Sequence, residues 1–262
     1  MTEPTLQGID FHASNAEDTQ VLTRDGMPQV RQRPIPEWEV EARNRLAAAV
    51  ERFSQPLADL VERDANEGDT RMLVADFLSD GLNYGKYDSL TTSYRTRGES
   101  VDYGILLDGE LFAFLEVKAC GQSLDARNLR QVKTHAAAEG LSWVVLTNGR
   151  HWQVHHVVDA DSGTTALVVD VDLFSEGSEE ANVDALFHLC REAVQDGRLD
   201  NLRAWREALA AEPLARLLRS RAVVDTICAE IRRDTGHTGH VGDTEDVLHA
   251  LRKSVLARGL GG

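Results

Sequence analysis

The stretch VDYGILLDGELFAFLEVK, residues 101–118, consists of two apolar runs separated by an Asp-Gly pair. Asp-Gly between apolar runs is the strongest short-range signal for a β-hairpin, because both residues tolerate the positive φ angles of a tight turn. The sequence therefore predicts one strand over 101–107 and a second over 111–118. The second run is apolar at every position from 111 to 115, which predicts a strand buried on both faces rather than an edge strand.

Three charged side chains lie near the ends of these two strands. Glu116 and Lys118 are two residues apart, so they share one face of the second strand. If the turn is a two-residue loop, Asp102 lies opposite residue 115 and is a diagonal neighbour of Glu116. Two carboxylates this close repel each other unless a cation lies between them, and burying them without a partner is costly.

Oxygen ligands of this kind favour a magnesium site. Mg²⁺ takes one or two carboxylates and keeps several waters, often together with a substrate phosphate. We expect Asp102, Glu116 and the main-chain carbonyl of Val117 to hold Mg²⁺, with Mn²⁺ as the alternative ion. Lys118 would position or help to deprotonate the attacking water and offset charge on the phosphate. This set of groups suits hydrolysis of a phosphodiester bond.

The segments around the hairpin predict an α/β fold in which a mixed sheet is flanked by helices. Helical periodicity is found before and after the hairpin, and an Asn-Gly turn joins two further strands. The predicted elements are helices over 37–64 (broken or kinked near Pro56), 67–80 and 124–139, and strands over 142–147 and 151–158.

The two ends of the chain differ from this central part. Residues 1–35 are polar and interrupted by prolines, which predicts a flexible N-terminal arm before a domain over 36–174. Beyond residue 175 only helical patterns follow, so a helical C-terminal region over 175–262 is expected. Its predicted helices span 181–196, 200–210, 213–234 with a break near Ala222, and 244–257.

Three further side chains are candidates for an accessory role. Gln131 and His135 are four residues apart on the helix over 124–139, so they share a helix face that could turn toward the site. Glu67 begins the helix over 67–80 and adds a carboxylate, although the helix dipole also favours an acid in a first turn.

The chain of 262 residues has 28 Lys and Arg against 43 Asp and Glu, a formal net charge of −15. This charge excludes a basic surface over the whole protein, so a nucleic acid would have to be bound by a few basic side chains gathered in one place. The three cysteines form no CxxC motif, and no apolar leader or long apolar run is present, which predicts a cytoplasmic protein without a membrane partner. The candidate nucleic-acid contacts are Arg95, Arg97, Arg127, Arg130, Lys133 and Arg150.

Asp102, the triplet Glu116-Val117-Lys118 and Gln131 together resemble the motif of the PD-(D/E)xK nuclease superfamily. More narrowly, residues 67–158 resemble the N-terminal nuclease domain of type I restriction enzyme R subunits and their stand-alone relatives. The resemblance implies a restriction-endonuclease-like fold, Mg²⁺ binding by the aspartate and the glutamate, catalysis by the lysine and assistance by the glutamine. His135 stands where that family usually has a tyrosine.

We expect no counterpart of the R subunits' helicase motor in this sequence. A phosphate-binding loop of the form GxxxxGK[ST] is missing from the sequence, and GLNYGKY at 81–87 is one residue short and lacks the hydroxyl. We therefore expect no ATP site.

Two classes of function remain open. The first is a Mg²⁺-dependent endonuclease acting on DNA in restriction or another defence system, with a second copy of the chain (a homodimer) or methylase, specificity or motor subunits as candidate partners. The second is a non-catalytic, nuclease-like module that binds nucleic acid or protein and works with a separate motor subunit. Cleavage of RNA would use the same chemistry. A zinc site built from Cys228, His237 and His240 is a minority interpretation, because three candidates fall short of four ligands.

Overall fold

The computed structural model describes residues 21–22, 28–29, 34–96, 99–159, 164–175, 179–238 and 243–256. The chain divides into two compact units, residues 1–36 and 37–262. In the first unit, the two-residue strands β1 (Val21–Leu22) and β2 (Pro28–Gln29) pair antiparallel, which the sequence did not predict. The rest of the predicted arm up to residue 33 lies outside the described residues.

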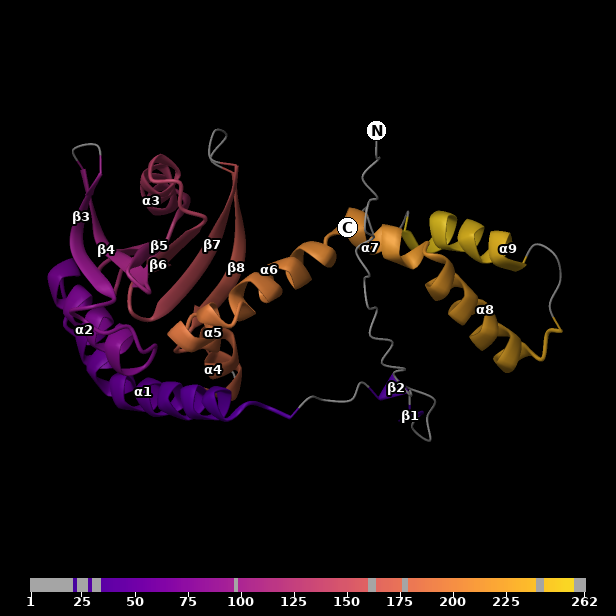
Figure 1. The fold of residues 1–262 in the computed structure, drawn as a ribbon, viewed down its shortest axis with the longest axis horizontal. Helices are drawn as coiled ribbons and strands as arrows, with labels where there is room; N and C mark the ends of the chain where they lie inside the picture. Colours follow the sequence, from indigo (N-terminus) through magenta and orange to yellow (C-terminus); the bar gives the residue numbers. More distant parts are fainter. Residues whose placement is uncertain are drawn as a thin grey trace, which may run out of the picture. The chain divides into compact units, whose positions relative to one another are not determined.

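The second unit is built on a six-stranded mixed sheet with the order β3-β4-β5-β6-β7-β8 (Figure 1). Only β5 and β6 pair in parallel, and the other neighbours are antiparallel. The mixed sheet and its flanking helices confirm the predicted α/β class, and β5 is an interior strand as expected. The strands are β3 (Leu90–Thr96), β4 (Glu99–Leu107), β5 (Glu110–Val117), β6 (Trp143–Thr147), β7 (His151–Asp159) and β8 (Thr164–Asp172).

Strands β3 and β8 are the two edge strands of the sheet, and the sequence did not predict them. Each pairs with only one neighbour, so neither needs the continuous apolar run that marks a strand buried on both faces. The sequence of β3 is LTTSYRT, and most of its described side chains are exposed. The buried residues of β8 are Val168, Val169 and Val171, all in its second half.

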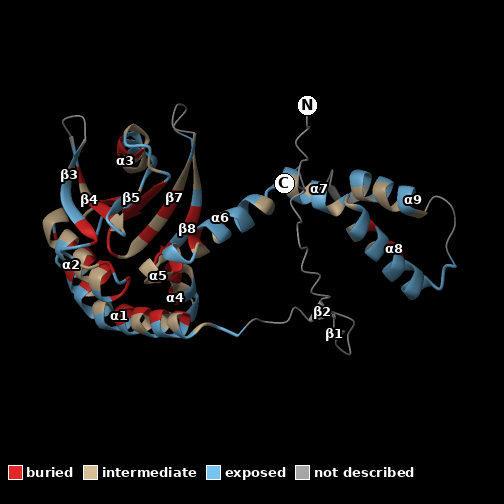
Figure 2. Cartoon of the chain, viewed as in Figure 1, coloured by how far each residue is buried: buried red, intermediate tan, exposed pale blue. Residues whose placement is uncertain are grey.

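Helices cover both faces of the sheet (Figure 1). On one face lie α1 (Glu37–Glu62), a single helix that contains Pro56, and α2 (Glu67–Asp80). Their apolar side chains share the main core with Leu115 and Val117 of β5. On the other face, α3 (Ala126–Ala138) packs against Phe114. Successive residues of β5 therefore point to opposite faces, and both faces are buried (Figure 2).

The hairpin between β4 and β5 contains the predicted tight turn and an unpredicted β-bulge. Asp108 and Gly109 both have positive φ angles, of 52° and 89°. The pairing register shifts by one residue between Ile105 and Leu106, so that Tyr103 lies opposite Leu115.

This bulge corrects the predicted position of Asp102. The regular hairpin would set Asp102 opposite Leu115 and therefore on the face away from Glu116. Continuing the observed register by one residue sets Asp102 opposite Glu116 instead. Directly opposed residues of antiparallel strands share a face, so the bulge brings the two carboxylates to the same side of the sheet.

The C-terminal region is helical, as predicted, with more breaks than the sequence suggested. The expected helix over 181–196 is two helices, and the break expected near Ala222 falls at Arg219–Ser220. The helices are α4 (Glu179–Phe187), α5 (Arg191–Gln195), α6 (Arg198–Ala208), α7 (Ala211–Leu218), α8 (Arg221–Thr235) and α9 (Asp243–Ala250), followed by the π-helix η1 (Leu251–Leu256).

These helices differ in how they are buried (Figure 2). Leu186 and Phe187 of α4 and Ala193 of α5 belong to the main core, so the core extends beyond residue 175. By contrast, α7 has no buried residue, and α8 buries only Val224 and Cys228. Within the described ranges, no helix is long and apolar enough to cross a membrane.

Candidate active site

The candidate site lies at one end of the sheet, where β4 begins and β5 ends. Glu116 is the last residue but one of β5, and Lys118 follows the strand directly. The main-chain N–H of Lys118 donates to the carbonyl oxygen of Thr147 over 2.8 Å, which extends the pairing with β6 by one residue. The backbone that carries both side chains is therefore fixed by the sheet.

Helix α2 approaches this end of the sheet with its N-terminus. Asn66 caps the helix by accepting a hydrogen bond from the N–H of Asp69. One turn later, the hydroxyl oxygen of Thr70 accepts the N–H of Cys120 over 3.1 Å, which ties the loop after Lys118 to α2. Cys120 itself is buried.

Asp102 is held between the sheet and this helix. Its Oδ2 accepts the main-chain N–H of Val117 at 2.8 Å, and its Oδ1 accepts a hydrogen bond from Nη1 of Arg71 at 2.8 Å. The side chain of Asp102 is 10% exposed, whereas that of Arg71 is 41% exposed. Each carboxylate oxygen thus has one donor, and the pair with Arg71 can be reached by solvent.

Glu116 and Lys118 contact each other as the strand alternation predicts. Lys118 Nζ donates to Glu116 Oε1 over 2.7 Å, and the two side chains are 12% and 8% exposed. Lys118 Nζ also lies 3.6 Å from Oε2 of Glu67, the first residue of α2. We call Glu67, Asp102 and Glu116, together with Lys118 and Arg71, the acid cluster.

The acid cluster perturbs the ionisation of its members. Burial raises the pKa of Glu116, and the charges of Asp102 and Glu67 raise it further, against the hydrogen bond from Lys118. Burial alone would lower the pKa of Lys118, but the hydrogen bond to Glu116 and the surrounding carboxylates raise it overall. Lys118 is therefore a protonated ammonium at neutral pH, which suits it to orient an oxygen or offset negative charge.

The chemistry of the cluster fits a hard divalent cation. Three carboxylates face two cationic side chains, so one negative charge remains, and oxygen ligands of this kind are those that Mg²⁺ prefers. Among the described residues, no group of three or more His, Cys, Asp and Glu side chains is arranged to hold a metal ion. An ion here would thus have two carboxylates from β4 and β5, a main-chain oxygen such as that of Val117, and water.

The two predicted helix side chains lie differently from one another. Gln131 is exposed on α3, and none of the cluster's hydrogen bonds described above comes from it. His135 is buried against the sheet beside Val132 and Ala136. The two side chains therefore do not form one exposed accessory pair.

The basic residues predicted to contact nucleic acid differ in their exposure and in their partners. Arg95 of β3 and Arg127 and Arg130 of α3 are exposed, Lys133 is half-buried, and Arg97 lies outside the described residues. Arg150 forms a bidentate pair with Asp172, with nitrogen–oxygen distances of 2.7 and 2.6 Å, and its guanidinium lies over the ring of Phe174. We call Arg150 and Asp172 the β7–β8 ion pair. Its geometry gives Arg150 a structural role.

Arg71 is the residue of the acid cluster that sequence reasoning missed. It contacts Asp102 from 31 positions earlier in the chain, and no local pattern encodes that contact. The available signal was its place four residues after Glu67 on one face of the same helix.

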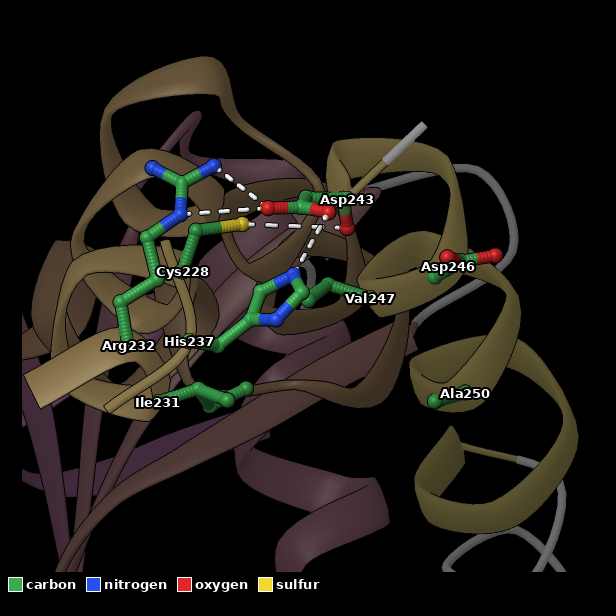
Figure 3. A pocket seen from close by; sticks show the side chains of 8 residues that line it. All are labelled: Cys228, Ile231, Arg232, His237, Asp243, Asp246, Val247 and Ala250. Atoms are coloured by element: carbon green, nitrogen blue, oxygen red, sulfur yellow. Dashed lines mark hydrogen bonds and ion pairs between the residues drawn. The ribbon is translucent and has the colours of Figure 1, made fainter. Parts of the chain in front are cut away.

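Two residues of the minority zinc interpretation, Cys228 and His237, line a pocket between α8 and α9 with a volume of about 300 Å³ (Figure 3). Asp243 is its polar centre. Its carboxylate accepts from Arg232 over 2.7 Å, lies 3.6 Å from His237 Nε2, and its main-chain oxygen is 3.9 Å from Cys228 Sγ. These contacts tie the two helices together, and His240 lies outside the described residues.

Comparisons of the chain with models of protein families, with curated proteins and with solved structures found no match. The chemistry and geometry of the acid cluster therefore carry the functional interpretation.

Proposed function

We propose that this protein is a Mg²⁺-dependent nuclease that hydrolyses phosphodiester bonds of DNA, as an endonuclease of a restriction or other defence system. The observation that carries the proposal is the contact between Lys118 and Glu116, beside Asp102, at the ends of two neighbouring strands. A restriction-endonuclease-like arrangement of the mixed sheet is part of the same proposal.

Each member of the acid cluster has a role in this proposal. Asp102 and Glu116 would hold Mg²⁺, with the main-chain carbonyl of Val117 as a further ligand. When bound, the ion would supply a Lewis acid and lower the pKa of a bound water. Lys118, protonated between Glu116 and Glu67, would orient the attacking oxygen and offset charge on the scissile phosphate.

DNA would be positioned by exposed basic side chains, because the overall charge of the protein is negative. Arg95, Arg127 and Arg130 are exposed on β3 and α3 and are the candidates for phosphate contacts. Contacts of this kind set the register of the duplex and carry no sequence information. Binding should therefore weaken steeply as salt is raised.

One observation favours the non-catalytic alternative. Asp102 already has Arg71 as its cation, and Glu116 already has Lys118, so both carboxylates are partly neutralised without a metal. A module that only binds nucleic acid or protein would need no ion at this place. Calorimetric titration with Mg²⁺ or Mn²⁺ separates the two proposals, because only the nuclease requires a bound ion.

Cleavage assays test the nuclease proposal directly. Supercoiled plasmid, linear duplex, single-stranded DNA and RNA are each incubated with the purified chain, once with Mg²⁺ and once with EDTA. We expect nicking or linearisation of plasmid with Mg²⁺ only, and its loss in Asp102→Asn. Cleavage that persists in EDTA or in Asp102→Asn would contradict the assignment, and preference for RNA would replace DNA as the substrate.

Asp76→Asn is the matched control for this assay. Asp76 lies on α2 like Glu67 and Arg71, but its carboxylate pairs with Lys86 at the surface. The same change from acid to amide should therefore leave cleavage unaltered.

A further inference from the structure

Arg71 holds the only carboxylate oxygen of Asp102 that does not face the backbone of β5. Oδ2 accepts the N–H of Val117, and Oδ1 accepts the guanidinium of Arg71 at 2.8 Å. An ion bound to Asp102 would have to take a lone pair at one of these oxygens. Displacing the N–H of Val117 would leave a buried main-chain donor without a partner, which is costly. Each carboxylate oxygen can accept more than one partner, but a cation at Oδ1 would lie beside the guanidinium of Arg71, and the two positive charges would repel each other.

The position of Arg71 allows such an exchange. Its main-chain oxygen accepts the hydroxyl of Tyr103 over 2.9 Å, so the backbone of α2 is fixed to β4 at this residue. Its side chain is nevertheless 41% exposed, whereas Asp102 is 10% exposed. The guanidinium can thus leave Asp102 for solvent without movement of the helix.

Charge balance gives the exchange a direction. The acid cluster contains three carboxylates and two cationic side chains, which leaves one negative charge. Without the guanidinium two negative charges remain, and a divalent cation neutralises them. The hydrogen bond with Asp102 and the nearby charge of Glu67 also hold Arg71 in its charged form.

We propose that Arg71 is an internal counter-ion that occupies the cation position of Asp102 in the metal-free protein and competes with the divalent ion for that carboxylate. The inference rests on the metal site of the proposed function and makes Arg71 a positioning residue. A purely structural ion pair would lose stability on mutation without any gain in metal affinity. Removing a competing counter-ion frees Asp102 and therefore raises the affinity for the metal.

Calorimetric titration of the full chain with Mn²⁺, without nucleic acid, tests this competition. We expect Arg71→Gln to bind Mn²⁺ about tenfold more tightly than the unchanged chain, the size expected when a partly exposed ionic competitor is lost. Arg71→Lys keeps the positive charge without the planar fork and should have an affinity between the two. The melting temperature of Arg71→Gln should be lower without metal, and its rise on adding Mn²⁺ should be larger.

Arg63→Gln is the matched control. Arg63 pairs with Asp69 of α2 at 3.1 Å on the exposed surface, so its loss removes an ion pair of the same helix outside the acid cluster. Its Mn²⁺ affinity should equal that of the unchanged chain.

The outcomes separate this inference from the proposed function. Equal or weaker Mn²⁺ binding in both Arg71 variants, with binding still abolished by Asp102→Asn, would overturn the counter-ion and leave the metal site intact. Tighter binding in Arg71→Gln with no cleavage of any nucleic acid would support the counter-ion and overturn the nuclease. Mn²⁺ binding that survives Asp102→Asn would overturn both.

Discussion

Two charged sites lie along the same end of the six-stranded sheet and balance their charges differently. In the β7–β8 ion pair, one guanidinium meets one carboxylate through two hydrogen bonds, and this bonding lowers the pKa of Asp172. In the acid cluster, three carboxylates face two cations, and burial and neighbouring charges raise the pKa of Glu116. A balanced pair is complete without a ligand, whereas a cluster with one carboxylate more than its cations can be stabilised by a further cation. The balance of charge thus distinguishes a structural pair from a candidate binding site.

The largest expected effect follows from removing the amine of the acid cluster. Lys118→Ala should slow plasmid cleavage by about 10²–10⁴-fold, the range found when a positioned catalytic group is lost. The measurement is the initial rate of nicking with saturating Mg²⁺. Asp172→Asn, at the other site, should leave this rate within about twofold, because its charge is used within the ion pair.

Equal cleavage rates in Lys118→Ala and Asp172→Asn would contradict the distinction between the acid cluster and the β7–β8 ion pair. Full activity in Lys118→Ala would remove the lysine from the reaction. An equal loss in Asp172→Asn, with the fold intact by circular dichroism, would mean that the β7–β8 ion pair also belongs to the active site.

The second effect is stabilisation by a divalent ion. Saturation to about one hundred times Kd should stabilise the folded chain by about 2.7 kcal/mol. For a chain of this size that corresponds to a rise of roughly 5–10 °C in the melting temperature. Asp102→Asn should lose the rise and Asp172→Asn should keep it, as followed by calorimetric melting with and without Mn²⁺. An equal rise in all three proteins would place the ion elsewhere.

The third effect concerns pH and the β7–β8 ion pair. Because Arg150 lowers the pKa of Asp172, the pair stabilises the fold above the ordinary carboxylate pKa, and this stability is lost as pH falls through the lowered value. Asp172→Asn should therefore cost about 1 kcal/mol of unfolding free energy at neutral pH, and progressively less as the pH falls below the ordinary carboxylate pKa. Urea unfolding at several pH values measures the difference. A cost independent of pH would show that charge is not its cause.

The smallest effect is expected at an exposed pair outside both sites. Arg63 and Asp69 are half-exposed at 3.1 Å, so solvent screens their attraction. Arg63→Gln should change the unfolding free energy by no more than about 0.5 kcal/mol. A larger cost in the same urea experiment would mean that burial does not set the order of these two ion pairs.

Sequence patterns were sufficient for the tight turn and for the buried strand that carries Glu116 and Lys118. The turn at Asp108-Gly109, the buried strand before Glu116 and the shared face of Glu116 and Lys118 all follow from local rules. Local rules were also sufficient for α2, whose bounds were predicted as Glu67–Asp80.

The remaining features depend on contacts between distant segments. The bulge near Ile105 sets the face of Asp102, yet nothing in the hairpin sequence marks it. The partner of Asp102 comes from α2, and the edge strands β3 and β8 lack the apolar runs that identify interior strands. The burial of His135 likewise follows from how α3 packs on the sheet.

Crystals grown with Mn²⁺ and measured at a wavelength where manganese scatters anomalously test the central claim most directly. The account predicts one strong anomalous peak within coordination distance of the carboxylates of Asp102 and Glu116, with the guanidinium of Arg71 turned away from Asp102. A map without a peak there at saturating Mn²⁺, with Asp102 still bound to Arg71, would contradict it.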